Sequence, residues 1–375
     1  MEEENGVFAG KKKRKKSELI HQKQLELFLI PEAPGSGLSH TIEFLSSAPR
    51  FVRGKNLTQP RDYEGKLNIV RSYEDKINKV LYGATVTISP AIMELVDKKN
   101  GVVEECFVYP GSDVEILEKI FIKLGTRGQG KLTKDSRGRS IFGVSFTINQ
   151  IVNEMRALGK ARRPAEIIQA IETGVNTRVT IKVESPDKKD CWEISDGIFS
   201  NFIRVRRSQY EQQDELDKAC FIALHPLVVK CLQDQGFRKF DYEKNLSYSS
   251  PLTRWIHERL SHKYIYAATG HGYNFRLTTF VKLFGGSIYV SLKDNHKEFK
   301  KSLDDLLADG VLKKWDYEII KDKNDKRKTI DYKYFCWASD QFIASTIQYN
   351  IEKSERSRKY LNFIEKIDSD WEEST

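Results

Sequence analysis

The period of apolar positions changes several times between residues 110 and 200, and each change predicts a new element. Apolar residues spaced three or four apart predict helices, and strict alternation with polar residues predicts strands. In order, these elements are a helix over 112–124, a strand over 141–146, helices over 148–158 and from Pro164 onward, and a hairpin over 179–194 with a charged tip at 184–190. This is the order of a winged helix-turn-helix domain.

The elements recur in the same order roughly 130–140 residues later, without convincing sequence identity between the two copies. In order, the second set is a helix from Pro251 through Leu260, a short strand at 275–277, a brief helix over 278–284, a helix over 292–309, a strand over 315–319, a charged tip at 321–328 and a return strand over 332–337. We therefore expect an α+β, mainly helical fold that contains two tandem winged-helix domains.

Several of these helices begin with capping signals. Ser112, Thr147 and Ser291 each stand three residues before a Glu, Gln or Asp, which is the spacing of a capping box. Ser250 precedes Pro251, and proline is preferred at the first position of a helix. We expect the four hydroxyl groups to accept hydrogen bonds from backbone N–H groups of the first helical turn.

Composition divides the chain into four parts. In order, these are a basic tail and Pro-rich linker at 1–67, an N-terminal winged-helix domain at 68–215, a C-terminal winged-helix domain at 216–345, and a C-terminal helix with an acidic tail at 346–375. Lys11–Lys16 is a run of six basic residues, and four of the ten prolines fall within 31–62. Both features are typical of segments without a packed core, so we expect the N-terminal segment to be disordered.

The overall charge permits nucleic-acid binding without establishing it. The 375 residues carry 62 Lys and Arg against 53 Asp and Glu, which gives a formal net charge of +9. No stretch approaches the roughly 18 consecutive apolar residues of a membrane span, and no apolar segment follows the basic N-terminal run as it would in a secretory signal. Five scattered cysteines without a CxxC pair argue against a disulfide framework or a zinc module. We therefore expect a cytoplasmic protein with no membrane partner.

Basic residues gather in the second copy where a winged helix would meet DNA. Lys293, Lys297, Lys300 and Lys301 fall on one flank of the 292–309 helix. This helix occupies the recognition position, whose N-terminal side chains meet base edges in the major groove. The following tip adds cations that are placed to touch phosphates: Lys321, Lys323, Lys326, Arg327 and Lys328. The alternative is an ordinary charged surface helix, because acidic residues share both the helix and the tip.

The first copy has basic residues at the corresponding positions. The candidate DNA-binding residues here are Lys160, Arg162, Arg163, Gln169, Lys188 and Lys189. The first three precede the helix that begins at Pro164, where free N–H groups and the helix dipole favour phosphate oxygens. Gln169 is placed to read a base edge, and the two lysines occupy the hairpin tip. The alternative is a degenerate winged helix used for dimerisation.

Two near-matches to catalytic motifs fail on their geometry. The segment 125–132 nearly matches a phosphate-binding P-loop, but it follows a predicted helix and lacks the Ser or Thr that binds magnesium. His257 and His262 are five residues apart, whereas two zinc ligands on one face of a helix need a spacing of four. We therefore expect no catalytic residue, no metal and no cofactor, and we predict that the chain is not an enzyme.

Two stretches of the chain resemble plasmid replication initiators of the iteron-binding type. FVYPGSDVEILEKIFIKL (107–124) is similar to the Phe-Tyr-Pro-Gly segment and the acidic helix that follows it in these proteins. SPLTRWIHERLSHKY (250–264) is similar to the helix that opens their second winged helix. The resemblance spans residues 70–340, and it implies two winged helices that bind repeated origin sequences, called iterons, in double-stranded DNA.

The resemblance also implies partners and residue roles. Monomers would help to open an A+T-rich segment and recruit the host initiator and replicative helicase, and dimers would repress their own promoter. Carried over by position, the DNA-reading residues are Lys293, His296, Lys297, Lys300 and Lys301, with Lys326, Arg327 and Lys328 in the wing. A winged-helix transcriptional regulator without a replication function is the alternative. An enzyme such as a nickase or primase is a third hypothesis, for which the sequence offers no site.

Overall fold

The computed structural model shows an α+β protein. It describes residues 23, 38–54, 57–77, 80–96, 101–134, 138, 140–184, 191–204, 219–233, 237–268, 270–285 and 291–372. Within these residues, sixteen strands form five antiparallel sheets and ten α-helices accompany them. The expectation of a mainly helical chain is therefore not confirmed. Most of the predicted disordered segment, 1–22 and 24–37, lies outside the described residues.

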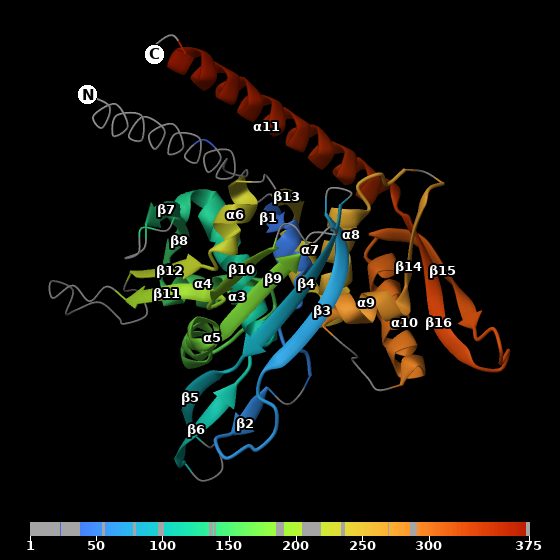
Figure 1. The fold of residues 1–375 in the computed structure, drawn as a ribbon, viewed down its shortest axis with the longest axis horizontal. Helices are drawn as coiled ribbons and strands as arrows, with labels where there is room; N and C mark the ends of the chain where they lie inside the picture. Colours follow the sequence, from blue (N-terminus) through green and yellow to red (C-terminus); the bar gives the residue numbers. More distant parts are fainter. Residues whose placement is uncertain are drawn as a thin grey trace.

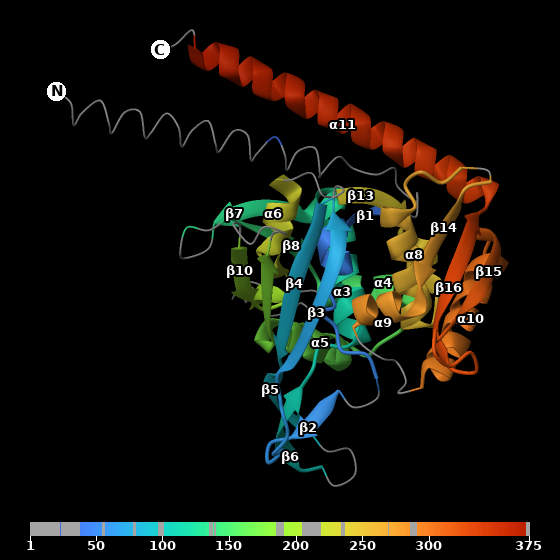
Figure 2. The ribbon, with the colours of Figure 1, turned by 45° about the vertical axis from the view of Figure 1, so that its right-hand side comes forward.

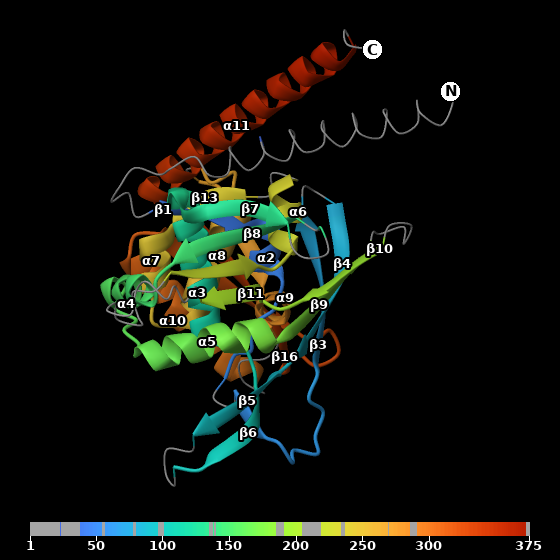
Figure 3. The ribbon, with the colours of Figure 1, turned by 90° about the vertical axis from the view of Figure 1, so that its left-hand side faces the viewer.

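The N-terminal half supplies all but one strand of three sheets. Its elements are β1 (Leu38–Ile42), α2 (Glu43–Ser47), β2 (Thr58–Pro60), β3 (Ile69–Ile77), β4 (Val80–Ser89), β5 (Ala91–Val96), β6 (Val103–Val108), α3 (Ser112–Leu124), a single π-helical turn η1 (Gly125–Gln129), β7 (Gly130–Lys134), β8 (Ser140–Phe146), α4 (Ile148–Ala157), α5 (Pro164–Asn176), β9 (Arg178–Glu184), β10 (Cys191–Asp196) and β11 (Phe199–Arg204). Figure 3 shows α5 beneath the sheet that contains β8 and β11, with α3 beside it.

The predicted elements of the first copy are present, but the predicted hairpin is part of a larger sheet and does not form a separate two-stranded wing. The hairpin β9–β10 joins the long strands β3 and β4 in a sheet of order β10-β9-β4-β3. β8 lies in a second sheet of order β11-β12-β8-β7, and a small third sheet has the order β2-β6-β5. The small sheet projects from the body at the bottom of Figures 1 and 2.

The C-terminal half packs three helices on one face of a three-stranded sheet. Its elements are β12 (Cys220–Leu224), α6 (Leu227–Gln233), β13 (Phe237–Asp241), α7 (Tyr242–Ser247), α8 (Pro251–Lys263), β14 (Gly272–Arg276), α9 (Leu277–Phe284), α10 (Leu292–Ala308), β15 (Leu312–Lys321), β16 (Thr329–Ala338) and α11 (Asp340–Glu372). The sheet order is β14-β16-β15. Phe280 stacks on Phe275 with ring centroids 3.7 Å apart, and Trp255 meets Phe280 edge-on, so aromatic rings form the core between α8, α9 and the sheet.

The linker predicted for 31–62 is wrong where the structure describes its central part. Residues 38–42 form β1, which pairs with β13, and Ile42 and Leu45 are 1% and 3% exposed. The segment forms part of the core because it packs between α3 and α8. The domain boundary predicted at 215/216 also needs revision, because β12 pairs with β8 and β11 of the preceding half.

Helix α11 extends well beyond the body of the protein (Figures 1 and 2). Its N-terminal part is fixed to β1 and β13: the Arg356 guanidinium lies 4.7 Å from the Phe237 ring centroid and 3.1 Å from Nε2 of His40. In the part of the chain that the structure describes, no helix has the length and apolar character needed to cross a membrane.

The capping predictions are confirmed at three of the four helix starts. The side chains of Thr147, Ser250 and Ser291 accept hydrogen bonds from backbone N–H groups three residues ahead. The prediction for Ser112 is wrong, because Gly111 precedes α3 and no side chain caps the helix. Ser112 instead accepts a hydrogen bond from Nη2 of Arg254, at 2.6 Å.

Candidate nucleic-acid interface

Helix α10 presents three lysines on its solvent face. Ser291 caps the helix, and its inward face buries an apolar row that includes Phe299, Leu303 and Leu306. Three exposed residues share the opposite side at a spacing of four: Lys293, Lys297 and Lys301. Because residues four apart lie one above the other on a helix, the three ammonium groups form one cationic stripe.

The other two residues assigned to this helix pack on the sheet instead. The His296 ring stacks on Tyr332 at 3.8 Å between centroids, and its Nδ1 lies 2.6 Å from the Tyr334 hydroxyl. Burial and the neighbouring Lys300 ammonium lower the pKa of His296, which favours the neutral ring. The Lys300 ammonium lies over the rings of Trp315 and Tyr317, 5.9 and 5.5 Å from their centroids. Both residues therefore hold α10 against β15 and β16 in this structure.

The tip of the β15–β16 hairpin is ordered by its own acidic residues. Asp322 accepts a hydrogen bond from the backbone N–H of Asn324 at 2.8 Å, and Asp325 accepts one from that of Arg327 at 2.9 Å. Such side-chain contacts stabilise turns, so the two carboxylates shape the loop that carries the cations. The basic side chains of the tip are all exposed: Lys321, Lys323, Lys326, Arg327 and Lys328. The tip lies at the same end of the molecule as the N-terminus of α10 (Figures 1 and 2).

The basic cluster before α5 is largely engaged within the protein. Arg162 makes a two-pronged ion pair with Asp113, with N–O distances of 2.9 and 3.0 Å. Lys160 donates to the backbone carbonyl of Tyr248 at 3.0 Å, so it links the loop before α5 to the segment before α8. Arg163 and Gln169 are exposed. Lys188 and Lys189, assigned to the hairpin tip, lie outside the described residues.

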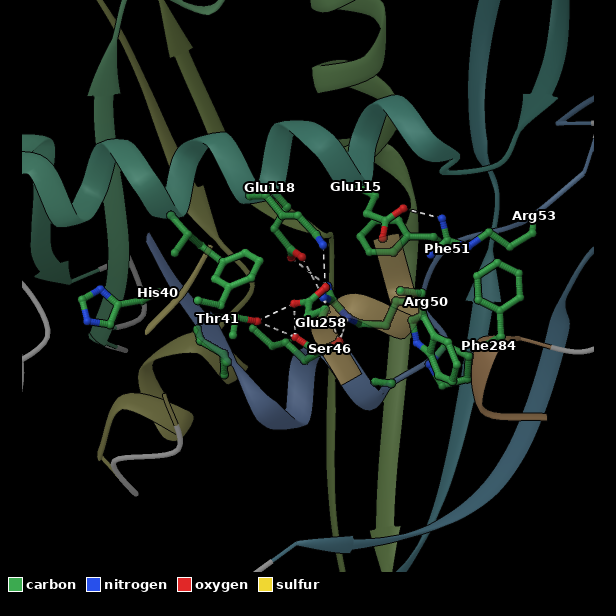
Figure 4. A pocket seen from close by; sticks show the side chains of 18 residues that line it. His40, Thr41, Ser46, Arg50, Phe51, Arg53, Glu115, Glu118, Glu258 and Phe284 are labelled. Carbon is green, nitrogen blue, oxygen red and sulfur yellow. Dashed lines mark hydrogen bonds and ion pairs between the residues drawn. The ribbon is translucent and has the colours of Figure 1, made fainter. Parts of the chain in front are cut away.

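The two stretches that carry the family resemblance meet in a buried network of charges. Lys119 of α3 binds Glu258 of α8, with Nζ and Oε2 2.5 Å apart and both side chains no more than 10% exposed. Lys119 also donates to Asn245 at 3.0 Å. Thr41 and Ser46 donate to the other oxygen of Glu258 (Figure 4). Burial alone would raise the pKa of Glu258, but the Lys119 ammonium and these hydrogen bonds outweigh burial and lower it to about 2.

A second group of buried charges extends this network towards the N-terminal segment. Arg50 binds both carboxylate oxygens of Glu118 at 2.8 Å, and Arg53 binds Glu115 (Figure 4). Glu115 also lies 4.0 Å from Arg254 of α8. Sequence reasoning did not identify this network. The sequence feature that could have revealed it is the presence of charged residues directly beside the apolar positions of 112–124. A helix at the protein surface would carry its charges on the face opposite its apolar positions.

The near-matches to catalytic motifs show no catalytic arrangement here. The segment 125–129 turns the chain from α3 into β7, with Gly128 at a φ of +91°, so no helix N-terminus follows it to cradle a phosphate. His257 and His262 are both buried in α8, beside Asn245 and Thr41 respectively. Among the described residues, no group of three or more His, Cys, Asp and Glu side chains could hold a metal ion.

Comparison with known proteins gives only distant structural similarity. No protein family model and no curated protein matches the sequence. The chain is similar to domains 2 and 3 of RctB, with 10% identity, a TM-score of 0.41 and coverage of 75% of this chain and 94% of that one. It is also similar to the Pi initiator protein in complex with iteron DNA, with 9% identity, a TM-score of 0.37 and coverage of 60% and 91%. At TM-scores below 0.5 these are partial similarities of shape.

Proposed function

We propose that the chain is a replication initiator that binds repeated sequences in double-stranded DNA through two tandem winged helices. The order α8, β14, α9, α10, β15, β16 and the packing of the helices on one sheet face support the second of these domains. The observation that carries the proposal is the lysine stripe of α10, formed by Lys293, Lys297 and Lys301, beside an ordered basic tip at the same end of the molecule. The stripe would enter the major groove, and the tip would contact adjacent phosphates.

Footprinting on DNA that flanks the gene is the first experiment. We expect protection of short direct repeats beside an A+T-rich tract. Protection of a single inverted site, together with failure of that DNA to replicate as a plasmid, would favour the transcriptional regulator. The resemblance of the α3 and α8 segments to plasmid initiators supports the initiator. Recruitment of a host initiator and helicase is part of this proposal, and co-purification on the opened repeat DNA tests it.

Replacing Lys297 and Lys301 by Ala tests the assigned interface. The loss of one contact to a base pair costs roughly 1–3 kcal/mol of binding free energy, so we expect the Kd for the repeat duplex to rise at least tenfold. Fluorescence anisotropy with the labelled repeat duplex measures the Kd. The matched control replaces two exposed lysines of α11, Lys359 and Lys366, by Ala. Equal affinity of both double variants would refute the assignment.

We also propose that the protein dimerises and that it acts without catalysis. The edge strand β5 supports dimerisation, because Ile92 and Val96 are 48% and 62% exposed and Val103 opposite Val96 is 58% exposed. An open edge with apolar side chains favours pairing with another strand.

Metal-dependent strand cleavage or primer synthesis by the purified protein would overturn the non-enzymatic part of the proposal.

A further inference from the structure

The outer face of the β14-β16-β15 sheet carries two aromatic rings in a row. β16 alternates, so Tyr334 and Cys336 point towards the helices and are fully buried, whereas Phe335 and Trp337 lie on the opposite face and are half-buried. Their ring centroids are 6.3 Å apart and their planes differ by 24°. The sheet lies at the rim of the molecule, on the far side of α8 and α10 from the rest of the fold (Figure 1).

Cationic groups accompany both rings. The Lys314 ammonium lies 5.1 Å from the Trp337 centroid, and the Lys333 ammonium lies 4.7 Å from the Phe335 centroid. On β14, the exposed Asn274 stands opposite Phe335 and the exposed Arg276 opposite Lys333. Residues directly opposite in an antiparallel pair share a face, so the rings, an amide and three cations belong to one surface.

Two carboxylates of β15 share this surface. Asp316 stands opposite Phe335 and Glu318 opposite Lys333. Asp316 accepts a hydrogen bond from the backbone N–H of Tyr317 at 2.8 Å, so one of its oxygens is engaged locally. The carboxylates lie on the β15 side and Asn274 and Arg276 on the β14 side, with the rings of β16 between them. The cationic path for a polyanion therefore runs along Arg276 of β14 and Lys333 of β16, and Lys314 of β15 joins it beside Trp337.

We infer that this outer face binds single-stranded DNA by stacking bases on Phe335 and Trp337. Unpaired bases expose the flat faces that aromatic rings bind, and phosphates meet the nearby ammonium and guanidinium groups. A duplex offers no free base face, so this surface would not compete with α10 for double-stranded DNA. The inference goes beyond the proposed duplex reading and is independent of it, because the two surfaces use different residues on opposite sides of the sheet.

Binding of a fluorescein-labelled 20-nucleotide oligo(dT) to the full chain, followed by anisotropy, tests the inference. Stacking on one ring changes affinity by roughly 5- to 150-fold, so we expect Trp337→Leu to raise the Kd by at least fivefold and Trp337→Phe, which keeps a ring, to retain most of the binding. The matched control is Tyr266→Leu, since Tyr266 is an aromatic residue elsewhere that is 76% exposed. Oligo(dT) should also quench tryptophan fluorescence in the wild type more than in Trp337→Phe.

The outcomes separate this inference from the proposed function. An unchanged Kd for oligo(dT) in Trp337→Leu, or equal quenching in the wild type and Trp337→Phe, would overturn the inference even if duplex binding is normal. Loss of oligo(dT) binding in Trp337→Leu with retained duplex binding supports it and shows that the variant is folded. The variant Lys297→Ala/Lys301→Ala should bind oligo(dT) like the wild type. Failure of duplex binding in the wild type would remove the proposed function and leave the single-strand result intact.

Discussion

Replacing Glu258 by Gln removes a charge from the buried network while it preserves the shape of the side chain. The Lys119 ammonium would then lose its charged partner and have two neutral acceptors, the Asn245 oxygen at 3.0 Å and the oxygen of the new amide. An ammonium that is buried without its partner costs about 3–5 kcal/mol. We expect a loss of unfolding free energy of that size, measured by urea denaturation with circular dichroism. The pair joins α3 to α8, so both motif helices should be affected.

Removing both charges separates the cost of an unpaired charge from the worth of the pair. Because no charge remains buried alone, the double variant Lys119→Met/Glu258→Gln should recover most of the stability, with a coupling energy of about 2 kcal/mol or more. The control is Asp113→Asn, whose ion pair with Arg162 is 36–38% exposed and whose loss should cost at most about 1 kcal/mol. A Glu258→Gln variant that loses less than 1 kcal/mol, or a double variant with strictly additive losses, would refute the reasoning.

Three further predictions follow from other parts of the structure. Burial lowers the pKa of His257 to about 3 and that of His262 to about 4, whereas the unfolded chain takes up these protons near pH 6.5. The free energy of unfolding, measured in urea, should therefore fall below pH 6.5 by about 1.4 kcal/mol per pH unit for each histidine. An unfolding free energy that is constant between pH 7 and 5 would contradict this. Gly285→Ala should lower the melting temperature, because Gly285 has a φ of +118° and an added Cβ would meet the Arg71 guanidinium at 2.8 Å; an unchanged melting temperature would show that the turn relaxes. Val96→Lys on the edge strand β5 should shift sedimentation towards monomer, whereas an unchanged dimer fraction would exclude this edge.

The helices that carry both periodicity and a cap could be predicted from the sequence. The segments of α4, α8 and α10 have an apolar row and a Ser or Thr placed before it, and these local signals are sufficient. The segment 38–51 gave the opposite signal, because prolines and small polar residues are typical of a linker. In the fold, Ser39, His40 and Thr41 are buried by strand pairing with β13. A partner two hundred residues away leaves no local pattern to detect.

The same limit applies to the candidate interface. A helical wheel places Lys293, Lys297, Lys300 and Lys301 on one flank, and the structure leaves all of them but Lys300 exposed. The wheel cannot show that Lys300 lies over the aromatic rings of β15, or that His296, which was assigned by the resemblance, stacks on a ring of β16. Those rings come from strands whose position depends on the whole sheet.

The location of the family-like segments changes what their resemblance means. Lys119 of α3 binds Glu258 of α8, and Arg254 of α8 lies 4.0 Å from Glu115 of α3. The segments around these residues therefore specify how the two halves of the chain are joined. The lysine stripe of α10 lies outside both segments. Under the proposed function, a chain could keep this architecture and change the DNA sequence that it reads, because different residues carry the two properties. Exchanging Lys293, Lys297 and Lys301 for the residues at these positions in a plasmid replication initiator should then alter the preferred repeat while the unfolding free energy stays within about 0.5 kcal/mol.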